Sequence, residues 1–427
     1  MTTSEDHSIL VVGGGPAGLT VAVALGRIGL DVALAAPPHR PSYQAGGANS
    51  DRRTAALFGG SVELLRNLGV WEALAPVSEP LNAIRIIDDT ARLLTAPEVV
   101  FRASEAGLDA FGYNVPNAAL VEALLTAARQ PGSGVRVIET AGVDALDCRA
   151  DHAHAVTREG VKIRAQLVAA ADGRSSLCRA AAGIETKTWS YPQCAVVCAF
   201  EHSRPHRNIS TEFHRAAGPF TLVPMPGKAS SLVWVETPED AKRLAALDDA
   251  AMVAAIEDRL HGLVGSVSAI TPRASFPLSG LSAETFAKNR VALIGEAGHV
   301  IPPIGAQGLN LGLRDAAVLA DCVAEARSTS GDLGGPQLMQ AFASARHTDV
   351  TSRIWTIDLL NRSLLSEFTA IQLARGAGLF ALQSLGPLRR FLLREGIQPS
   401  NATPSLMSPD GLAALRARMR QAQSIVA

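Results

Sequence analysis

The sequence carries almost no net charge. Its 427 residues include 39 Lys and Arg against 40 Asp and Glu, a formal balance of −1 at pH 7. Such a chain has no overall electrostatic field that would recruit nucleic acid or an anionic lipid surface. We therefore expect no nucleic-acid partner, and we expect any charged contact to be local.

Cysteine is scarce and follows no pattern. The five cysteines are scattered along the chain without a CxxC pair, which favours reduced thiols in a cytosolic protein. Cys194, Cys198, His202 and His206 are spaced four residues apart, but the first two lie in the apolar stretch "CAVVCAF". Zinc sites usually contain a closely spaced pair of ligands, so we expect no metal site.

The chain also lacks an uninterrupted hydrophobic run of membrane-spanning length. The apolar stretch 8–38 is broken by three consecutive glycines, Pro16, Arg27 and Asp31, and acidic residues precede it. These interruptions argue against a signal peptide and a transmembrane helix, and we expect a cytoplasmic protein. With 47% hydrophobic and 19% charged residues, the composition is that of a globular enzyme of two or three domains.

A glycine-rich turn stands at the front of the chain, where residues 8–36 predict a strand, a helix and a second strand. The turn has the pattern Gly13-x-Gly15-x-x-Gly18. Gly13 permits the turn, Gly15 lets the backbone approach a pyrophosphate, and Gly18 lets helix and strand pack closely. The alternative is a turn without a ligand, but the strand–turn–helix context favours a dinucleotide site with the anion on free N–H groups.

One expected residue is missing from this unit. The second strand usually ends in Asp or Glu, which accepts hydrogen bonds from the adenosine ribose, but Ala36 occupies that position. Losing a charged acceptor forfeits about 1.5–3 kcal/mol. The substitution therefore disfavours a freely diffusing NAD and suits a larger cofactor that is held along its whole length.

Two further segments predict contacts to a phosphate or to the cofactor. "DRRTAALFGGSVELL" places basic residues just before a predicted helix, and we assign Arg53 to a phosphate and Arg52 to solvent, with a solvated pair to Asp51 as the alternative. "AQLVAAADGRSSLCR" predicts a strand that ends in Asp172-Gly173 and points a carboxylate above the sheet edge. The alternative for Asp172 is a helix cap.

The middle of the chain changes to short alternating strands. Four strands are predicted over 191–236, two helices over 238–262, and another strand over 273–280. Residues 82–96 alternate like a hairpin that turns at "DDTA". We expect an antiparallel sheet inserted into the parallel one, suited to roofing a cavity.

The chain then returns to the first sheet through "ALIGEAGHVIPPIGAQGLNLGLRDA". Residues 290–295 predict a buried strand with Glu296 at its carboxyl end, where ligands of open α/β sheets bind. A helix starts near Gly308–Asn310 and presents unpaired N–H groups. The carboxylate can accept hydroxyl hydrogens and the helix start favours negative charge, so this loop suits a reduced flavin ring and its ribityl chain.

These motifs, in this order, resemble those of FAD-dependent aromatic monooxygenases of the para-hydroxybenzoate hydroxylase type. The resemblance rests on Gly13–Gly18, on Asp172-Gly173 with Ser176 and Arg179, and on 295–315, and it covers residues 8 to about 395. "DRRTAALFGGSVELLRNLGVW", "GYNVPNAAL", "GPFTLVP" and "IGAQGLNLGLRD" are similar to the ubiquinone-biosynthesis hydroxylases in particular.

The resemblance implies an α/β fold with a Rossmann-like FAD-binding domain on a parallel sheet, an inserted antiparallel-sheet substrate domain and a C-terminal helical region. The FAD-binding domain would comprise 1–76, 108–185 and 286–327, the substrate domain 77–107 and 186–285, and the helical region 328–427. The implied FAD-contacting residues are Gly13, Gly15, Ala17, Gly18, Arg53, Asn117, Asp172, Gly173, Glu296, Pro303, Gly308, Leu309 and Asn310. Pro303, Gly305 and Gln307 would flank the flavin ring. Glu296 replaces the usual Asp of the family, so its ribityl contact is expected to be shifted or water-mediated.

The resemblance also implies the reaction. NAD(P)H reduces the flavin, dioxygen adds to carbon 4a, and the hydroperoxide transfers oxygen to an electron-rich ring, so the cofactor carries the difficult chemistry. No second GxGxxG is present for NADPH or NADH, as is usual in this class. We expect a hydrophobic aromatic substrate, a polyprenylated phenol of ubiquinone biosynthesis. No base for the phenol is identified, and His299 is interpreted as structural.

Several rival interpretations are weighed. A plain NAD dehydrogenase is disfavoured by Ala36 and the later motifs, and a flavin halogenase by "IWTIDL", which lacks the WxWxIP pattern. A tailoring hydroxylase of another aromatic pathway and a non-catalytic flavin- or lipid-binding scaffold stay open. "LGPLRRFLLREG" suits a surface-seeking helix or a helix packed on the core. With a polyprenyl substrate, peripheral contact with the inner membrane or a biosynthetic complex is expected.

Overall fold

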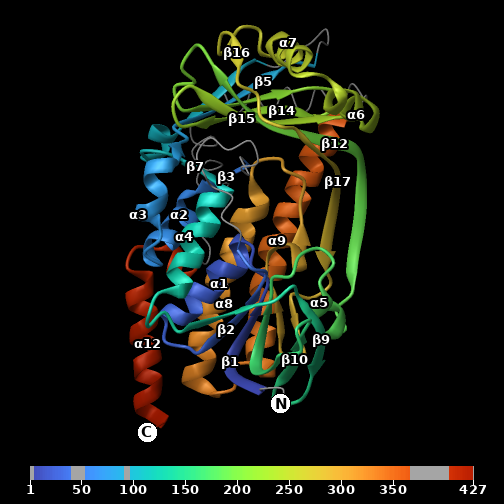
Figure 1. Ribbon diagram of the computed structural model, residues 1–427. Coiled ribbons are helices and arrows are strands. Elements are labelled where there is room, and N and C mark those ends of the chain that lie inside the picture. Colours follow the sequence, from blue (N-terminus) through green and yellow to red (C-terminus); the bar gives the residue numbers. More distant parts are fainter. Residues whose placement is uncertain (1–3, 40–52, 91–96, 366–402, 427) are drawn as a thin grey trace.

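The computed structural model describes residues 4–39, 53–90, 97–365 and 403–426. These segments form two layers, one built on a mainly parallel sheet and one on a mainly antiparallel sheet (Figure 1). The long helix α9 (Pro336–Leu365) runs beside both layers.

The first sheet has the strand order β18-β19-β11-β1-β2-β8, and its central strands β19, β11, β1, β2 and β8 pair in parallel. Its strands are β1 (Ser4–Val12), β2 (Val32–Ala36), β8 (Val135–Glu139), β11 (Lys162–Ala170), β18 (Ala287–Lys288) and β19 (Val291–Leu293), with β9 (Val143–Cys148) and β10 (Ala153–Thr157) added beside β11. Strands β2 and β19 and the carboxyl-terminal halves of β1 and β11 are continuously apolar because both faces of the sheet are covered there. Helices α1 (Pro16–Arg27), α4 (Asn117–Arg129) and α8 (Gln307–Thr329) cover one face, and α5 (Leu177–Ala181) lies on the other.

The second sheet has the order β20-β17-β12-β15-β14-β13-β5-β6, with β16 beside β12. Its strands are β5 (Ala83–Asp88), β6 (Val99–Arg102), β12 (Thr186–His202), β13 (Ile209–His214), β14 (Pro219–Met225), β15 (Ala229–Glu236), β16 (Val267–Ser268), β17 (Ala274–Ala283) and β20 (His299–Val300). β12 and β17 run from one layer to the other. The inserted antiparallel sheet expected from the alternating pattern is confirmed.

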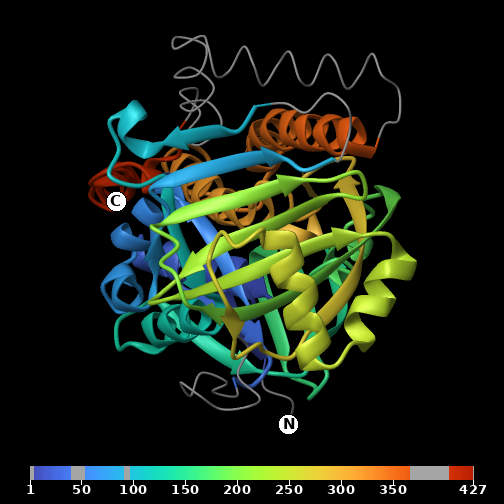
Figure 2. The same cartoon turned by 90° about the horizontal axis from the view of Figure 1, so that it is seen from above.

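The two faces of this second sheet differ. Helices α6 (Pro238–Ala246) and α7 (Asp249–Leu260) lie across its outer face (Figure 2), where Phe220, Leu222 and Trp234 are buried against them. The inner face, which carries Ser231, is turned toward the small sheet of β3 (Thr54–Phe58), β7 (Gly112–Pro116) and β4 (Glu79–Pro80), because Thr54 Oγ1 donates a 3.0 Å hydrogen bond to Ser231 Oγ.

The remaining elements connect and cover these sheets. They are α2 (Gly59–Asn67), α3 (Trp71–Leu74), α12 (Gly411–Val426) and the short 3-10 turns η1 (Ala75–Val77), η2 (Ala103–Ala106), η3 (Gly295–Ala297) and η4 (Ser405–Met407). α12 and η4 pack against α8. Among the described residues, no helix combines the length and the apolar composition needed to cross a bilayer.

Three local predictions need correction or fall outside the described residues. Arg53 precedes strand β3 rather than a helix, because the helix starts only at Gly59. The hairpin predicted over 82–96 exists, but its second strand begins at Val99. The predicted turn at "DDTA" would have placed that strand earlier in the chain. Arg52, which was assigned to solvent, lies outside the described residues. So does the stretch 385–396, for which a surface helix was one of two interpretations.

Candidate functional site

The three glycines at the start of α1 differ in the space around them. A Cβ atom on Gly13, whose φ is 121°, would lie 2.1 Å from Ala171 O, and one on Gly18 would lie 2.2 Å from Gly13 O. A Cβ on Gly15 would meet no atom within 4 Å. Gly13 and Gly18 therefore allow close backbone packing, while Gly15 faces open space at a helix start that no side chain caps. This end of α1 fits an anion such as a pyrophosphate.

The start of α8 has the same character. Its N-cap residue Ala306 is in the left-handed region with φ 53°, and no side chain caps the helix. Gly305, with φ 66°, and Gly308 also face open space. The two helices meet just behind these ends, since a Cβ on Gly312 would lie 3.3 Å from both Ala17 Cβ and Gly295 Cα. Two uncapped helix starts are thus brought to one region of the fold.

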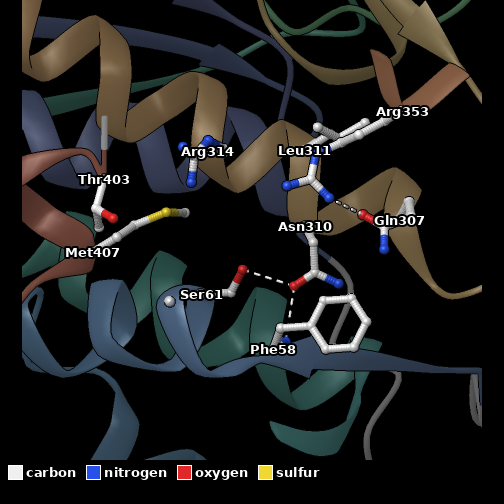
Figure 3. A pocket seen from close by; sticks show the side chains of 10 residues that line it. Phe58, Ser61, Gln307, Asn310, Leu311, Arg314, Arg353, Thr403 and Met407 are labelled. Carbon is white, nitrogen blue, oxygen red and sulfur yellow. Dashed lines mark hydrogen bonds between the residues drawn. The ribbon is translucent and has the colours of Figure 1, made fainter. Parts of the chain in front are cut away.

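Asn310 fixes the start of α8 to its neighbours. Its Oδ1 accepts hydrogen bonds from Phe58 N (2.9 Å) and Ser61 Oγ (2.7 Å), as Figure 3 shows. Its Nδ2 donates to Ala56 O and Ala306 O. The side chain is therefore fully used within the protein, and only backbone groups at this position are free for a cofactor. The cavity beside it, lined by residues of α2, α8 and η4, measures about 30 Å³, room for about one water molecule.

Arg53 and Asn117 lie side by side at the ends of β3 and β7. Asn117 N donates to Arg53 O at 2.9 Å, and the Arg53 side chain is exposed. Asn117 Oδ1 is buried without a hydrogen-bond partner among the described residues. An orphaned buried acceptor of this kind costs about 1–3 kcal/mol, so a donor supplied by a ligand fits here. Ala36, at the end of β2, is buried and offers no such polar group.

The Asp172 turn braces the loop that follows β19. Asp172 accepts from Ser176 Oγ (2.6 Å) and Cys178 N (3.1 Å), which agrees with the capping alternative. Gly173 is left-handed, with φ 82°, and faces open space. Arg179 donates to Ala297 O at 2.8 Å. The two motifs, more than a hundred residues apart in the chain, thus form one structural unit.

Glu296 is engaged by a residue that the sequence did not single out. Arg174 Nε donates to Glu296 Oε2 at 3.0 Å, and Arg174 Nη1 donates to Ser279 Oγ at 3.2 Å. The carboxylate is more than half exposed, so its ion pair with Arg174 is worth little. A ligand hydroxyl can therefore compete with Arg174 for Glu296 at small cost.

A buried ionic chain, here called the α9 clamp, ties both ends of the Gly295–Gln307 loop to α9. Asp315 Oδ2 accepts from Gly295 N (2.8 Å) and lies 2.8 Å from His299 Nε2, while Asp315 Oδ1 accepts from Arg346 Nε at 2.6 Å. Asp315 and Arg346 are almost fully buried. The position of His299 in this chain agrees with the structural role expected for it.

The same chain reaches the other end of the loop. Arg346 Nη1 donates to Asp349 Oδ2 at 2.7 Å, and Arg353 Nε donates to Asp349 Oδ1. Figure 3 shows the last link, in which Arg353 Nη1 donates to Gln307 Oε1 at 2.7 Å. Gln307, expected to flank the flavin ring, therefore has its side-chain oxygen turned toward α9. Burial raises the pKa of Asp315, but His299 and Arg346 outweigh that effect and lower its pKa overall.

No motif in the sequence marks Arg346, Asp349 and Arg353 as members of this site. Their spacing by three and four residues places them on one face of a helix, and this could have been noticed. A row of charges is usually a solvated face, however, and burial of the row depends on contacts with α8 that are distant in sequence.

The clamp predicts a specific dependence of stability on pH. Burial raises the pKa of Asp349, but Arg346, Arg353 and Arg314 outweigh it and hold the pKa at about 2, below the ordinary value of 3.8. A lowered folded-state pKa stabilises the protein above pH 3.8, and this contribution is lost as the pH falls toward 2. It amounts to about 2 kcal/mol.

Asp349→Asn is therefore expected to lower the free energy of unfolding at pH 7 and to flatten its decline as the pH falls from 3.8 toward 2, measured by denaturant titration. Asp147→Asn, which breaks an exposed ion pair with Arg149, is the control and should change neither quantity. An unchanged acid slope in Asp349→Asn would contradict the interpretation.

The fold combines a parallel sheet, the uncapped, glycine-lined start of α1, the uncapped start of α8 and an antiparallel sheet that covers them. This combination is typical of a dinucleotide-binding flavoprotein. The model of a family described as "FAD binding domain" matches residues 6–353. The chain belongs to this family, and it is a flavoprotein monooxygenase.

The relatives agree with this assignment. The chain is 34% identical over 400 residues to a protein of Rhodospirillum rubrum named ubiquinone hydroxylase UbiL, covering 93% of this chain and 91% of that one. It is 29% identical to the 3-demethoxyubiquinol 3-hydroxylase of Escherichia coli, covering 92% and 98%. The resemblance to the ubiquinone-biosynthesis branch is confirmed.

Solved structures show the same fold. The p-nitrophenol 4-monooxygenase PnpA of Pseudomonas putida superposes with a TM-score of 0.72 at 17% identity, over 93% of this chain and 100% of that one. HpxO of Klebsiella pneumoniae, solved with FAD and uric acid, gives a TM-score of 0.70 at 17% identity over 92% and 97%.

Proposed function

We propose that FAD is held between the starts of α1 and α8 by the residues that the sequence identified. These are Gly13, Gly15, Ala17, Gly18, Arg53, Asn117, Asp172, Gly173, Glu296, Pro303, Gly305, Gln307, Gly308, Leu309 and Asn310. Support comes from the open space at Gly15, the unpartnered Asn117 Oδ1 and the two uncapped helix starts. We also propose the three-part division of the chain at the boundaries given above.

We propose that the inner face of the second sheet covers an aromatic substrate. The single observation that carries this proposal is its burial pattern. Outer-face residues of β14 and β15 are buried, whereas the inner-face residues Val197, Thr221, Val223 and Val233 are only half-buried although they lie between the two layers. A mainly apolar surface left partly uncovered inside a protein suits a hydrophobic ring.

The reaction we propose is the hydroxylation of a polyprenylated phenol of ubiquinone biosynthesis, with NADPH or NADH as reductant and dioxygen as oxidant. When bound, FAD supplies the redox chemistry, passing electrons from the nicotinamide to oxygen. The protein's own residues bind and orient: the helix starts favour negative charge on the cofactor, and the apolar inner face excludes water from the ring. The names of the relatives from R. rubrum and E. coli support this substrate class.

The proposed reaction is tested with the purified protein and with a deletion of the gene. Purified FAD-loaded protein is expected to oxidise NADPH or NADH in step with formation of a hydroxylated prenylphenol, followed by mass spectrometry. Deletion of the gene is expected to accumulate a quinone precursor that lacks one hydroxyl group. Accumulation of an aromatic compound from another pathway instead would replace the substrate assignment, and nicotinamide oxidation without product would refute hydroxylation of this phenol.

We propose peripheral contact with the inner membrane through α9, as a polyprenyl substrate requires. Trp355 and Leu359 are 71% and 60% exposed, and they lie one turn apart on the same side of the helix. Tryptophan prefers the membrane interface. Trp355→Ser with Leu359→Ser is expected to abolish sedimentation with liposomes that contain anionic lipid and ubiquinone, while FAD content is retained. Wild-type protein that does not sediment would refute membrane contact at this surface.

A further inference from the structure

The inner face of the second sheet carries a pair of titratable residues that the function described so far does not use. Val223 is paired with Ser231, which faces β3, and Thr221 lies two residues from Val223 and therefore on the same face. Thr221 is paired in turn with Glu212. Glu212 and His214 are two residues apart on β13, so their side chains lie on the same face as Thr221. Glu212 and His214 thus belong to the face proposed to cover the substrate.

The geometry of this pair resembles that of a general base with its orienting carboxylate. His214 Nε2 lies 2.6 Å from Glu212 Oε1, and Thr221 Oγ1 donates to Glu212 Oε2 at 3.4 Å. A carboxylate at Nε2 keeps the proton of a neutral imidazole on that nitrogen, so Nδ1 presents its lone pair. The base–carboxylate arrangement is the one that serves proton abstraction in enzymes.

His214 Nδ1 has no hydrogen-bond partner within the described residues, although the side chain is only 4% exposed. The buried His202, on the outer face of the same sheet, contrasts with it: its Nδ1 lies 2.7 Å from Arg204 O and its Nε2 lies 3.0 Å from Ser230 Oγ. His202 therefore engages both ring nitrogens, whereas Nδ1 of His214, like Nδ1 of His299 on β20, has no partner among the described residues. His214 differs from His299 because it lies on the face proposed to cover the substrate.

The surroundings of His214 leave Glu212 as its direct partner. On one side Pro219 of β14 is paired with His214 and carries no titratable group. On the other side Asp88 of β5 is aligned with His214 and accepts from Thr90 Oγ1 at 2.7 Å.

We propose that His214 is the base that accepts the phenolic proton of the substrate, with Glu212 as its positioning residue. The phenol O–H bond breaks, the proton goes to Nδ1, and the O–H electron pair stays on the phenolate oxygen, which makes the ring more electron-rich. No oxidant or reductant is needed for this step. The inference rests on the proposed function, since it requires a phenol bound at the inner face.

The test uses FAD-loaded wild-type protein and the variants His214→Gln, Glu212→Gln and His202→Gln, with 2-prenylphenol as the probe. A general base contributes about 10²–10⁴-fold to the rate, so His214→Gln is expected to lower kcat/KM for hydroxylation by that factor and to remove the acidic limb of its pH profile. Glu212→Gln should lower it less and shift the limb. His202→Gln, a buried control, should keep both the rate and the profile.

A second readout follows the substrate directly. Ionised phenol absorbs at longer wavelength than neutral phenol, so an ultraviolet difference spectrum is expected to show phenolate on binding to wild-type protein and not to folded His214→Gln. If His214→Gln binds the probe, keeps its thermal stability and retains both phenolate formation and the pH profile, the assignment of His214 is overturned. If wild-type protein binds no phenol, the proposed substrate is wrong and this inference falls with it. If His214→Gln does not fold, Glu212→Gln decides, since an unchanged profile there overturns the pair.

Discussion

Replacing Arg346 by Met is expected to lower the free energy of unfolding by about 3–5 kcal/mol, because it leaves the fully buried Asp315 carboxylate without its cation. Folded proteins are stable by only about 5–15 kcal/mol, so this is a large fraction of the total. Asp315 also accepts from Gly295 N and is paired with His299. We therefore expect the Gly295–Gln307 loop to lose its position and FAD affinity to fall, measured by recovery of flavin fluorescence.

The control lies on the same helix. Arg362→Met breaks an exposed ion pair with Asp358, which is worth about 0–1 kcal/mol, and it should retain FAD. The double variant Asp315→Leu with Arg346→Met removes both buried charges, so its stability should partly recover. Its FAD affinity should not recover, because removal of Asp315 leaves Gly295 N without its acceptor. Equal recovery of both quantities would show that the α9 clamp acts on the fold and not on the loop.

The elements that could be predicted from the sequence are those whose cause is local. Gly13, Gly15 and Gly18 predict a turn because the three glycines lie within six consecutive residues. The apolar runs of β1, β2 and β19 predict buried parallel strands. The alternating pattern of 191–236 likewise follows from one covered face. The start of α8 was predicted to within a few residues for the same reason.

The residues that escaped prediction depend on distant contacts. Arg346 lies 31 residues from Asp315, and Arg174 lies 122 residues from Glu296, so nothing in the neighbouring sequence marks either one as a partner. Arg53 was assigned to a helix start because "TAALF" reads equally well as a short strand or as the first turn of a helix. The pairing of β3 with β7 decides it. The Glu212–His214 pair needs strand register, which a single sequence does not specify.

Gly15→Glu is expected to leave the fold intact and to abolish FAD binding. Gly15 has φ −75° and ψ 171°, a conformation that any residue adopts, and a Cβ there meets nothing within 4 Å. An acidic side chain at a helix start even interacts favourably with the helix dipole, so the free energy of unfolding of the FAD-free protein should change by less than about 0.5 kcal/mol. A carboxylate in the space proposed for the pyrophosphate should weaken FAD binding at least about 100-fold, near 2.7 kcal/mol.

The contrast with Gly13→Ala makes this result decisive. At Gly13 a methyl group would lie 2.1 Å from Ala171 O in a left-handed conformation, so that variant should lose the fold together with the cofactor. Gly15→Ala should be as stable as the wild type and lose only part of the affinity. A graded loss of FAD from Ala to Glu at constant stability can arise only if Gly15 faces the bound cofactor. Gly15→Glu protein that still takes up FAD as the wild type does would mean that this space is solvent, and the cofactor would have to be anchored at α8 alone.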